Sequence, residues 1–428
     1  MELSRRLQWV VGDMNTPTLR FKPQSGKSLN NWAKISLGDY IEGHKGGAPL
    51  RPSDFLLKGN FEVIPKKAIS SGGKLQLDEA NPTYCTESFF LGNQRSVVDE
   101  SYLITTLRDL VPSGPSIGYI VKICSEAKYL LAQGVYGIKI KPGLEEDFLI
   151  QYSNTIKYRE LMRTMMVGST QVHIRNGDFF KLQLHIPSID EQQKIASFLS
   201  KIDQKISLLT KKHELLVQYK KGVMQQIFSQ EIRCKDKEGK DFPEWEELSL
   251  SECAQIIGGG TPETSNSTYW GGTIQWFTPT ELKKKYVSTS IRKITDLGLR
   301  NSSAKLLPVG VVLFSSRATV GDVAISLNEC CTNQGFQSFI PKSGNSNEFL
   351  YYWISNNKKL FLEKASGSTF LEISKKEIEK ISVQIPSIEE QEKIAIFLSG
   401  VDKKIEFIQS QLELTKQYKR GLLQQMFI

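Results

Sequence analysis

Two segments of this chain repeat each other without a gap. Residues 186–228 and 385–427 are offset by 199 positions, and 24 of the 43 aligned residues are identical. Chance does not produce such agreement, and self-similarity at a fixed offset indicates a duplicated structural unit. The 428-residue chain is therefore predicted to consist of two halves that end in the same element.

The segments that precede the two repeats share weaker sequence similarities. Gln133-Gly134 recurs as Gln334-Gly335, and Trp32-Ala-Lys-Ile-Ser-Leu37 resembles Trp245-Glu-Glu-Leu-Ser-Leu250. We expect these segments to share one fold while their sequences have diverged. A constant element that carries two diverged domains favours a common scaffold with two different binding surfaces.

The repeated element is predicted to be a long amphipathic helix. Ser188 with Glu191, and Ser387 with Glu390, fit the capping box, in which the serine accepts from an early helix N–H and the glutamate reaches back. A helix of about 40 residues would be about 60 Å long. Apolar residues alternate in steps of three and four, which is the spacing of a coiled-coil seam. The seam positions are Ile195, Leu199, Ile202, Ile206, Leu209, Leu216, Ile394, Leu398, Val401, Ile405, Ile408 and Leu412.

So narrow a stripe needs a partner stripe, and each helix has one in the same chain. We expect an intramolecular coiled coil, and a pseudo-twofold duplication would make it antiparallel, with the two globular domains at opposite ends. His213 lies on the seam, where a polar residue that sets the register is expected. The alternative is that each helix packs flat on its own globular domain.

The segments outside the repeats are predicted to be mixed α/β domains. Short β-type runs such as Tyr119–Ile123 and Leu306–Phe314 are punctuated by Gly and Pro, and helices are expected over Phe148–Met165 and Phe349–Ala365. We therefore expect four parts in the chain. These are a first domain at 1–185 with an N-terminal tail at 1–17, a helix at 186–229, a second domain at 230–384 and a helix at 385–428.

The net charge of +9 is a modest indication of a polyanionic partner. Basic clusters with nearby aromatic residues occur in both domains. A single lysine run is better explained as a solvated loop, and only the recurrence in both halves favours a nucleic-acid partner. Lys and Arg neutralise phosphates, and Arg and Gln contact base edges. Trp276, Arg317 and Gln334 are as compatible with a role in the fold as with contacts. The DNA-binding candidates are Lys45, Lys66, Lys67, Lys283, Lys284, Lys285, Arg292, Arg317, Trp276 and Gln334.

We expect no catalysis and no metal site in this chain. The sequence has no P-loop and no Cys/His pair with metal-ligand spacing. Asn81-Pro82-Thr83-Tyr84 is one residue away from the Asn-Pro-Pro-aromatic motif of adenine methyltransferases, but no cofactor loop accompanies it, so we interpret it as a turn. The adjacent Cys330-Cys331 is expected at the end of a strand. Six cysteines without a disulfide or zinc pattern, no apolar run long enough for a membrane span and no secretory signal indicate the cytoplasm.

Both copies of the helix resemble the conserved regions of type I restriction–modification specificity subunits. The helices begin as I-P-x-I-x-E-Q-x-K-I-x-x-F-L-x-x-x-D and end as Q-Y-K-[KR]-G-x-x-Q-Q-x-F, each twice. The second domain also contains phrases typical of this family's target-recognition domains, whereas the first keeps Gln133-Gly134 and lacks Asn-Gln-Gly and Ser-Ser-Arg. Those phrases are Gly259-Gly260-Thr261-Pro262, Tyr269-Trp270-x-Gly272-x-Ile274-x-Trp276, Ser315-Ser316-Arg317-Ala318-Thr319-Val320-Gly321 and Asn333-Gln334-Gly335.

The resemblance implies a DNA specificity subunit that is not itself an enzyme. Each target-recognition domain would bind one half of a bipartite, asymmetric site in double-stranded DNA, and the paired helices would set the spacer. Two modification subunits, which use S-adenosylmethionine, would dock on the helices, and two restriction subunits would add ATP- and Mg-dependent translocation and cleavage. Two alternatives from other classes remain, namely a stand-alone DNA adenine methyltransferase and a structural coiled-coil protein.

Overall fold

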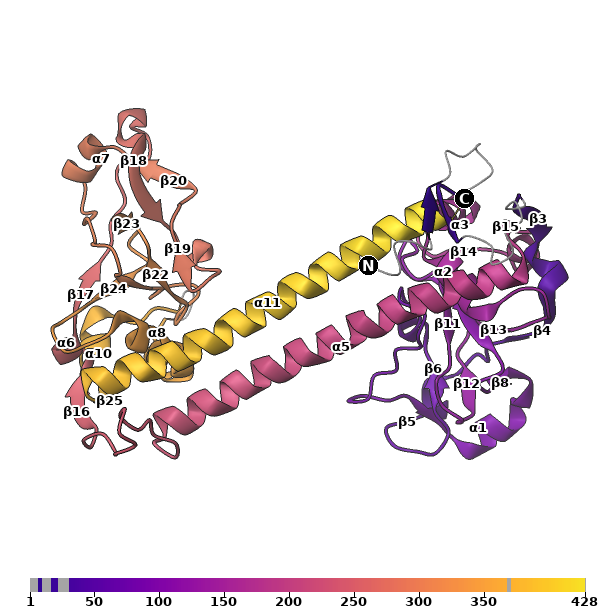
Figure 1. The fold of residues 1–428 in the computed structure, drawn as a ribbon, viewed down its shortest axis with the longest axis horizontal. Helices are drawn as coiled ribbons and strands as arrows, with labels where there is room; N and C mark the ends of the chain where they lie inside the picture. Colours follow the sequence, from indigo (N-terminus) through magenta and orange to yellow (C-terminus); the bar gives the residue numbers. More distant parts are fainter. Residues whose placement is uncertain (1–6, 10–16, 22–30, 368–370, 428) are drawn as a thin grey trace. The chain divides into compact units, whose positions relative to one another are not determined.

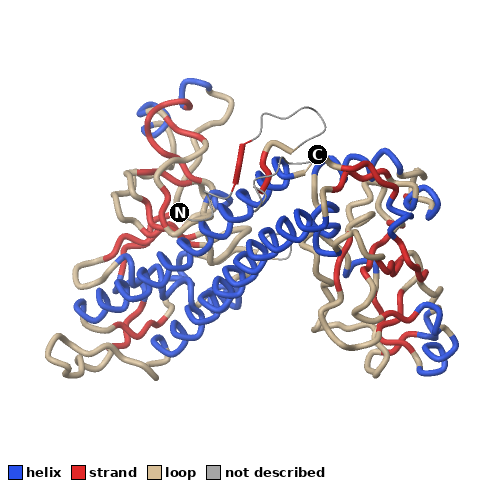
Figure 2. The backbone as a smooth tube through the Cα atoms, turned by 45° about the vertical axis from the view of Figure 1, so that its right-hand side comes forward, coloured by secondary structure: helices blue, strands red, loops and turns tan. Residues whose placement is uncertain are grey.

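The computed structural model describes residues 7–9, 17–21, 31–367 and 371–427. It divides into two compact units, each built from a mixed α/β domain and parts of two long helices (Figures 1 and 2). Unit 1 runs to Thr210 and includes the chain from Ser410 onward, and unit 2 comprises Lys211 to Gln409. Most of the expected N-terminal tail, residues 1–6 and 10–16, lies outside the described residues.

The two repeats form long helices, as predicted. Helix α5 spans Ile189–Phe228 and α11 spans Ile388–Met426. Each of the twelve predicted seam positions is buried or half-buried, whereas Lys201 and Lys205 beside them are exposed. No helix in the described part of the chain is long and apolar enough to cross a membrane.

Within unit 1, the beginning of α5 packs against the end of α11. Ile195 and Leu199 share a hydrophobic core with Leu422 and Met426. Further along α5, Asp203 pairs with Lys419 of α11, so the residue numbers rise along α5 as they fall along α11 and the two segments are antiparallel (Figure 1). The same core contains buried residues of the first domain, so the helix pair and the domain are packed together in one hydrophobic core.

Unit 2 repeats this arrangement with the opposite ends of the helices. Val223 and Ile227 of α5 share a core with Leu398 and Ile394 of α11, and Lys220 of α5 pairs with Asp402 of α11, which is again the antiparallel order. The prediction of an antiparallel helix pair is therefore confirmed inside each unit. The flat-packing alternative is only half right, because within each unit both helix segments share a core with the domain and with each other.

The main sheet of unit 1 has four antiparallel strands in the order β11-β9-β13-β4. A two-stranded ladder connects the first domain's β3, Ala33–Ser36, to β15, Gln183–Ile186, directly before α5. Smaller elements complete the domain. The main strands are β4 (Ile41–Gly46), β9 (Leu103–Thr106), β11 (Ile120–Lys122) and β13 (Val135–Ile140); the smaller elements are β1 (Leu7–Trp9), β2 (Leu19–Phe21), β5 (Phe55–Leu56), β7 (Tyr84–Cys85), β10 (Arg108–Asp109), β14 (Val172–His173), α1 (Glu87–Gly92) and α4 (Asn176–Phe180).

The main sheet of unit 2 has five strands in the order β17-β24-β21-β22-β19. Its two-stranded ladder joins β16, Glu246–Ser249, to β25, Ser382–Ile385, directly before α11. The fold is thus mixed α/β in both units, as predicted. The main strands are β17 (Ala254–Gly258), β19 (Tyr286–Val287), β21 (Val312–Phe314), β22 (Val323–Ser326) and β24 (Gln337–Pro341), and the short helices are α6 (Leu250–Cys253), α7 (Asp296–Arg300) and α10 (Lys375–Glu379).

Equivalent strands pair in the two units, with one shift of register. Ile140 pairs with Ile41 and the equivalent Pro341 pairs with Ala254, but a bulge between Lys139 and Ile140 displaces the remaining pairs of unit 1 by one residue. The ladders before the long helices match in register, Ala33 with Ile186 and Glu246 with Ile385. The weak sequence similarities therefore reflect a fold that the two domains share.

A three-stranded sheet in each domain breaks this equivalence. In unit 1 the order is β6-β12-β8, and in unit 2 it is β20-β18-β23. The parallel pair is common to both, β12 with β6 and β23 with β18, but the third strand joins opposite edges of that pair. These strands are β6 (Val63–Ile64), β8 (Val97–Val98), β12 (Tyr129–Leu131), β18 (Trp270–Phe277), β20 (Arg292–Ile294) and β23 (Cys330–Thr332).

The two helices expected before the ladders are each divided in two. The first consists of α2, Glu146–Ser153, and α3, Ile156–Met165. The second consists of α8, Asn347–Asn356, and α9, Lys358–Lys364. The first break arises because Thr155 adopts an extended conformation and its side chain accepts from Tyr158 N, which caps a new helix.

A buried glutamine ties each domain to its long helix with the same three hydrogen bonds. Gln192 Oε1 accepts from Glu145 N at 2.9 Å, and its Nε2 donates to the carbonyls of Gly143 and Pro187. Gln391 Oε1 accepts from Ser346 N at 2.8 Å, and its Nε2 donates to the carbonyls of Gly344 and Pro386. This agreement shows that the attachment of domain to helix is part of the duplicated unit, and its eight residues are Gln192, Gly143, Glu145, Pro187, Gln391, Gly344, Ser346 and Pro386.

The predicted capping boxes are only partly correct. Ser387 Oγ accepts from Glu390 N at 3.4 Å, but the glutamate side chains bind arginines instead of reaching back to the serine. Glu191 accepts from Arg20 Nε at 2.8 Å, and Glu390 accepts from Arg233 Nη2 at 2.9 Å. Both glutamates face the buried side of the helix, where pairing with a cation is needed to offset the loss of water.

Candidate nucleic-acid interface

Four sequence phrases of the second domain meet in one place in unit 2. Gly260 N donates to Thr332 O at 2.8 Å, and Trp276 Nε1 donates to Gly260 O at 2.9 Å. Ser316 N donates to Gly335 O at 2.8 Å, so the Ser-Ser-Arg turn lies against the Asn-Gln-Gly turn. We call this assembly the motif cluster, and it comprises Gly259–Thr261, Trp276, Ser315–Arg317 and Asn333–Gly335.

The motif cluster has a buried interior and exposed polar side chains at its surface. Trp276 is 4 % exposed, and its indole N–H is used within the cluster, so it is a structural member of the fold. Arg317 and Gln334 are exposed. Arg317 Nε pairs with Glu372 at 2.7 Å, and Gln334 Oε1 accepts from Thr261 Oγ1 at 2.5 Å. Arg and Gln side chains are the ones that form bidentate contacts with guanine and adenine.

Unit 1 contains the same arrangement without the same sequence. Leu107 N donates to Gly134 O at 3.2 Å, as Ser316 N does to Gly335 O. Thr106 Oγ1 donates to Arg108 O at 3.0 Å, as Ser315 Oγ does to Arg317 O at 2.9 Å. Arg108 and Gln133 therefore occupy the positions of Arg317 and Gln334, and both are exposed.

The sequence comparison found Gln133-Gly134 but missed Arg108. The phrase Thr106-Leu107-Arg108 shares only its arginine and a hydroxyl group two residues earlier with Ser315-Ser316-Arg317. A hydroxyl residue two positions before an arginine, at the end of a buried strand, is the signal that was available. It is too short to be significant without the register of the strands.

Among the predicted lysines, two are engaged in the fold. Lys285 has a side chain that is 9 % exposed, forms an ion pair with Glu348 and donates to Tyr352 Oη at 2.9 Å and Ser399 Oγ at 2.7 Å. Lys45 donates to Val97 O at 2.5 Å and lies 5.0 Å from the centre of the Tyr102 ring. These contacts account for both lysines within their own units, so we no longer expect either ammonium group to contact phosphate.

The other predicted cations have side chains that remain accessible to a ligand. Lys283 and Lys284 are exposed, and the Arg292 guanidinium is exposed at 3.5 Å from the centre of the Trp270 ring. Lys66 is half-buried, and Lys67 is exposed beside Asp78 at 3.4 Å. The structure therefore brings Arg317, Gln334 and Trp276 together in one cluster, and Lys66 lies beside the corresponding cluster of unit 1.

The features considered for catalysis have ordinary structural roles. Asn81 N donates to Asp78 Oδ1 at 3.0 Å, which places Asn81 in a turn shortly before β7, and Tyr84 is the first residue of that strand. Cys330 and Cys331 lie in β23, where burial raises the pKa of the Cys330 thiol to about 11 and that of Cys331 to about 12. Within the described ranges, no group of three or more His, Cys, Asp or Glu side chains is placed to hold a metal ion.

Comparison with known families decides the class of protein. A model described as the type I restriction modification DNA specificity domain matches residues 30–218 and 243–416. The chain belongs to the family of type I restriction–modification specificity subunits. Its function is DNA sequence recognition in such a system, and the comparisons give no support to a stand-alone methyltransferase or a purely structural coiled coil.

Relatives of this specificity subunit differ in how much of it they cover. It is 36 % identical over 195 residues to the MjaIX specificity subunit of Methanocaldococcus jannaschii, a match that spans 44 % of this chain and 45 % of that one. It is 22 % identical over 423 residues to the MjaVIII specificity subunit of the same organism, over 94 % of both chains. The crystal structure of an S subunit from M. genitalium shares the fold, with a TM-score of 0.59, 16 % identity and coverage of 96 % and 99 %.

Proposed function

We propose that each domain of this chain binds one half of a bipartite, asymmetric site in double-stranded DNA. The surface in the first domain would centre on Arg108 and Gln133, and that in the second on Arg317 and Gln334. The supporting observation is that both units hold an exposed arginine and an exposed glutamine at equivalent positions. The sheet beside them differs in strand order, so two different half-sites are expected.

We further propose that the paired helices set the spacer between the half-sites. Helices α5 and α11 are continuous over 40 and 39 residues, and their seams are buried. A continuous helix of that length is about 60 Å long. Half-sites contacted from one face of a duplex lie about one helical turn, ~34 Å, apart. The helices are therefore long enough to span that distance and to offer surface to partner subunits.

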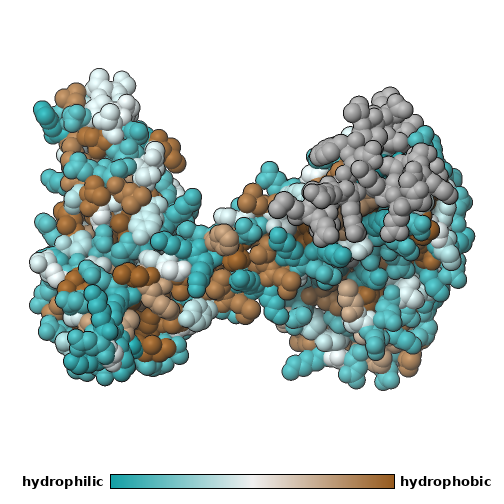
Figure 3. Space-filling view, in the orientation of Figure 1, coloured by the Kyte–Doolittle hydropathy of each residue, from teal (hydrophilic) through white to brown (hydrophobic). Residues whose placement is uncertain are grey.

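Two modification subunits are the proposed partners of the helices. In unit 2, Leu215 and Tyr219 of α5 are 54 % and 52 % exposed, one turn apart on the same face. In unit 1, the equivalent Leu414 and Tyr418 of α11 are 61 % and 56 % exposed. Hydrophobic residues are visible on the outer surface of the helices (Figure 3). Exposed apolar groups that recur at equivalent positions indicate two like interfaces.

The chain itself is proposed to bind neither cofactor nor metal and to catalyse no reaction. Modification subunits would use S-adenosylmethionine to methylate the DNA, and two restriction subunits would use ATP and Mg. Assembly with these partners would take place in the cytoplasm. A methyl-transfer assay with the purified chain alone tests this proposal, because activity without a partner would contradict it.

The spacer proposal is tested by lengthening both helices by one turn. Four residues would be inserted near Lys211 in α5 and at the matching Ser410 in α11, and methylated sites would be sequenced from cells that express the complete enzyme. We expect a changed spacer between unchanged half-sites. Altered half-sites with the original spacer would contradict the proposal. Exchange of residues 18–185 for those of a relative should change one half-site only.

A further inference from the structure

A short 3-10 turn borders the exposed arginine and glutamine in both units. In unit 1 it is η3, Lys66–Ala68, which follows β6, and in unit 2 it is η6, Pro279–Glu281, which follows β18. A Cβ atom added to Gly134 would lie 2.8 Å from Lys66 Cε, and one added to Gly335 would lie 3.1 Å from Pro279 Cγ. The two turns therefore occupy the same place, directly beside Gln133 and Gln334.

The chemistry of the two turns differs where their positions agree. Lys66 supplies an ammonium donor, whereas Pro279 at the equivalent position has no donor at all. The residue after the shared arginine differs as well, because Asp109 follows Arg108 and Ala318 follows Arg317. A charged donor and a charged acceptor are thus both present in unit 1 and both replaced in unit 2.

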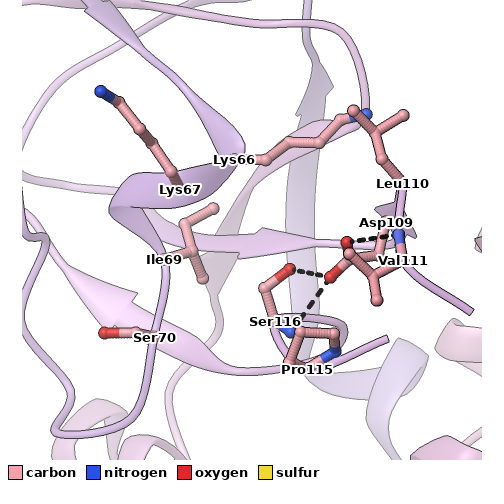
Figure 4. Close-up of a pocket in the computed structure, with 9 residues that line it drawn as sticks. All are labelled: Lys66, Lys67, Ile69, Ser70, Asp109, Leu110, Val111, Pro115 and Ser116. Atoms are coloured by element: carbon pink, nitrogen blue, oxygen red, sulfur yellow. Dashed lines mark hydrogen bonds between the residues drawn. The ribbon is translucent and has the colours of Figure 1, made fainter. Parts of the chain in front are cut away.

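An open pocket of about 440 Å³ lies between the turn and Asp109 in unit 1 (Figure 4). Its walls combine Lys66 and Asp109 with the apolar side chains of Ile69, Leu110 and Val111. No hydrogen bond or ion pair of the Lys66 ammonium is found within the part of the chain that the structure describes. The pocket is therefore lined by one ammonium donor, Lys66, one carboxylate acceptor, Asp109, and several apolar side chains.

Hydrogen bonds hold the Asp109 carboxylate in place. Oδ2 accepts from Ser116 Oγ at 2.6 Å and from Ser116 N at 3.2 Å, and Oδ1 accepts from Val111 N at 3.1 Å. Burial raises the pKa of Asp109, but these hydrogen bonds together outweigh it and lower the pKa below its usual value. The group is therefore ionised at neutral pH, and because its side chain is only half-buried the negative charge remains accessible to a donor from a ligand.

We propose that this pocket recognises a G·C base pair in the half-site bound by the first domain. Lys66 donates to guanine O6 or N7, and Asp109 Oδ1 accepts from cytosine N4. The major-groove edge of a G·C pair presents two acceptors and one donor, which is the complement of one ammonium and one carboxylate. The second domain, with Pro279 and Ala318 at these positions, does not select G·C there. This inference rests on the proposed function.

The test uses the complete enzyme and duplexes in which each position of its own site carries each of the four bases. With Lys66→Met we expect the preference for G·C to fall about 10- to 100-fold at one position of one half-site, and the other half-site to be unchanged. Asp109→Asn should weaken the preference for the same base pair. Lys66→Arg keeps a donor and should retain the preference, and Lys181→Met removes an exposed lysine of the same domain as a control.

Three results would overturn the proposal. A uniform loss of affinity over all sequences, with a salt dependence that falls by about one unit of slope, would show that Lys66 contacts phosphate. Loss of preference at a base pair other than G·C would show that the assignment of the base is wrong, and an unchanged preference would show that Lys66 makes no contact. If the wild-type enzyme had no bipartite site, the proposed function itself would fail, and the two failures are thus distinguishable.

Discussion

The Lys419 ammonium lies 2.6 Å from Oδ1 and 2.8 Å from Oδ2 of Asp203, and this pair joins α11 to α5 in unit 1. Gln151 of the first domain donates to the same carboxylate at 2.8 Å. Unit 2 repeats the arrangement, since Lys220 pairs with Asp402 at 2.6 Å, and Tyr352 of the second domain donates to Asp402 at 2.6 Å. Each long helix therefore has one lysine that pairs with an aspartate of the other helix, and a side chain of the domain binds the same aspartate.

Removal of Lys419 should destabilise unit 1. The Lys419 side chain is 10 % exposed, and Asp203 would lose its charged donor while it remains largely out of water. We expect Lys419→Met to lower the free energy of unfolding by about 2 kcal/mol, the range for a hydrogen bond to a charged group. Urea unfolding measures the effect. Lys416→Met, which removes an exposed lysine of the same helix, should leave it unchanged.

Loss of Gln391 should be more costly still. Its amide is fully buried and makes three hydrogen bonds to the main chain, so Gln391→Met would leave one N–H and two carbonyl groups without a partner. We expect the free energy of unfolding to fall by about 3 kcal/mol, because buried polar groups without partners cost about 1–3 kcal/mol each. Denaturant unfolding tests this, with Gln417→Met on the exposed face of α11 as the control. A loss no greater than that of the control would contradict the prediction.

The helices could be predicted from sequence because their signals are periodic and duplicated. The spacing of Ile195 and Leu199, or of Ile394 and Leu398, needs no knowledge of distant residues. The capping boxes failed for the opposite reason. Glu191 and Glu390 have the right spacing for a cap, but their side chains bind Arg20 and Arg233, and no local pattern records a partner over 150 residues away.

The candidate site was predicted only where its sequence was intact. Arg317 and Gln334 were found through phrases of the second domain, but Arg108 became evident only when hydrogen bonds of Thr106 and Leu107 matched those of Ser315 and Ser316. Lys285 belonged to the most basic run and yet is bound to Glu348, Tyr352 and Ser399. A run of like charge predicts exposure on average, but burial of one member depends on which residues the fold brings beside it.

Stability should depend on pH through His185. Burial and then the charges of Lys34 and Lys157 lower its pKa below the usual value. The unfolded chain therefore binds more protons than the folded one below about pH 6.5, and stability decreases as the pH falls through this window. We expect His185→Gln to reduce this loss when urea midpoints are compared between about pH 5 and pH 8. Lys34→Met, which removes the residue directly opposite in the strand pair, should raise the His185 pKa in an NMR titration.

Substitution of the two equivalent arginines should affect different halves of the DNA site. Arg108→Ala should weaken binding to the half-site of the first domain, and Arg317→Ala to that of the second, each by about 1–3 kcal/mol, because a bidentate contact with a base is lost. Binding of the complete enzyme to duplexes with one altered half-site measures each effect. Arg317 also pairs with Glu372, so Glu372→Gln is the matched control and should preserve both half-site preferences. If Arg108→Ala and Arg317→Ala changed the same half-site, or if Glu372→Gln reproduced the effect of Arg317→Ala, the equivalence of the two surfaces would not extend to DNA recognition.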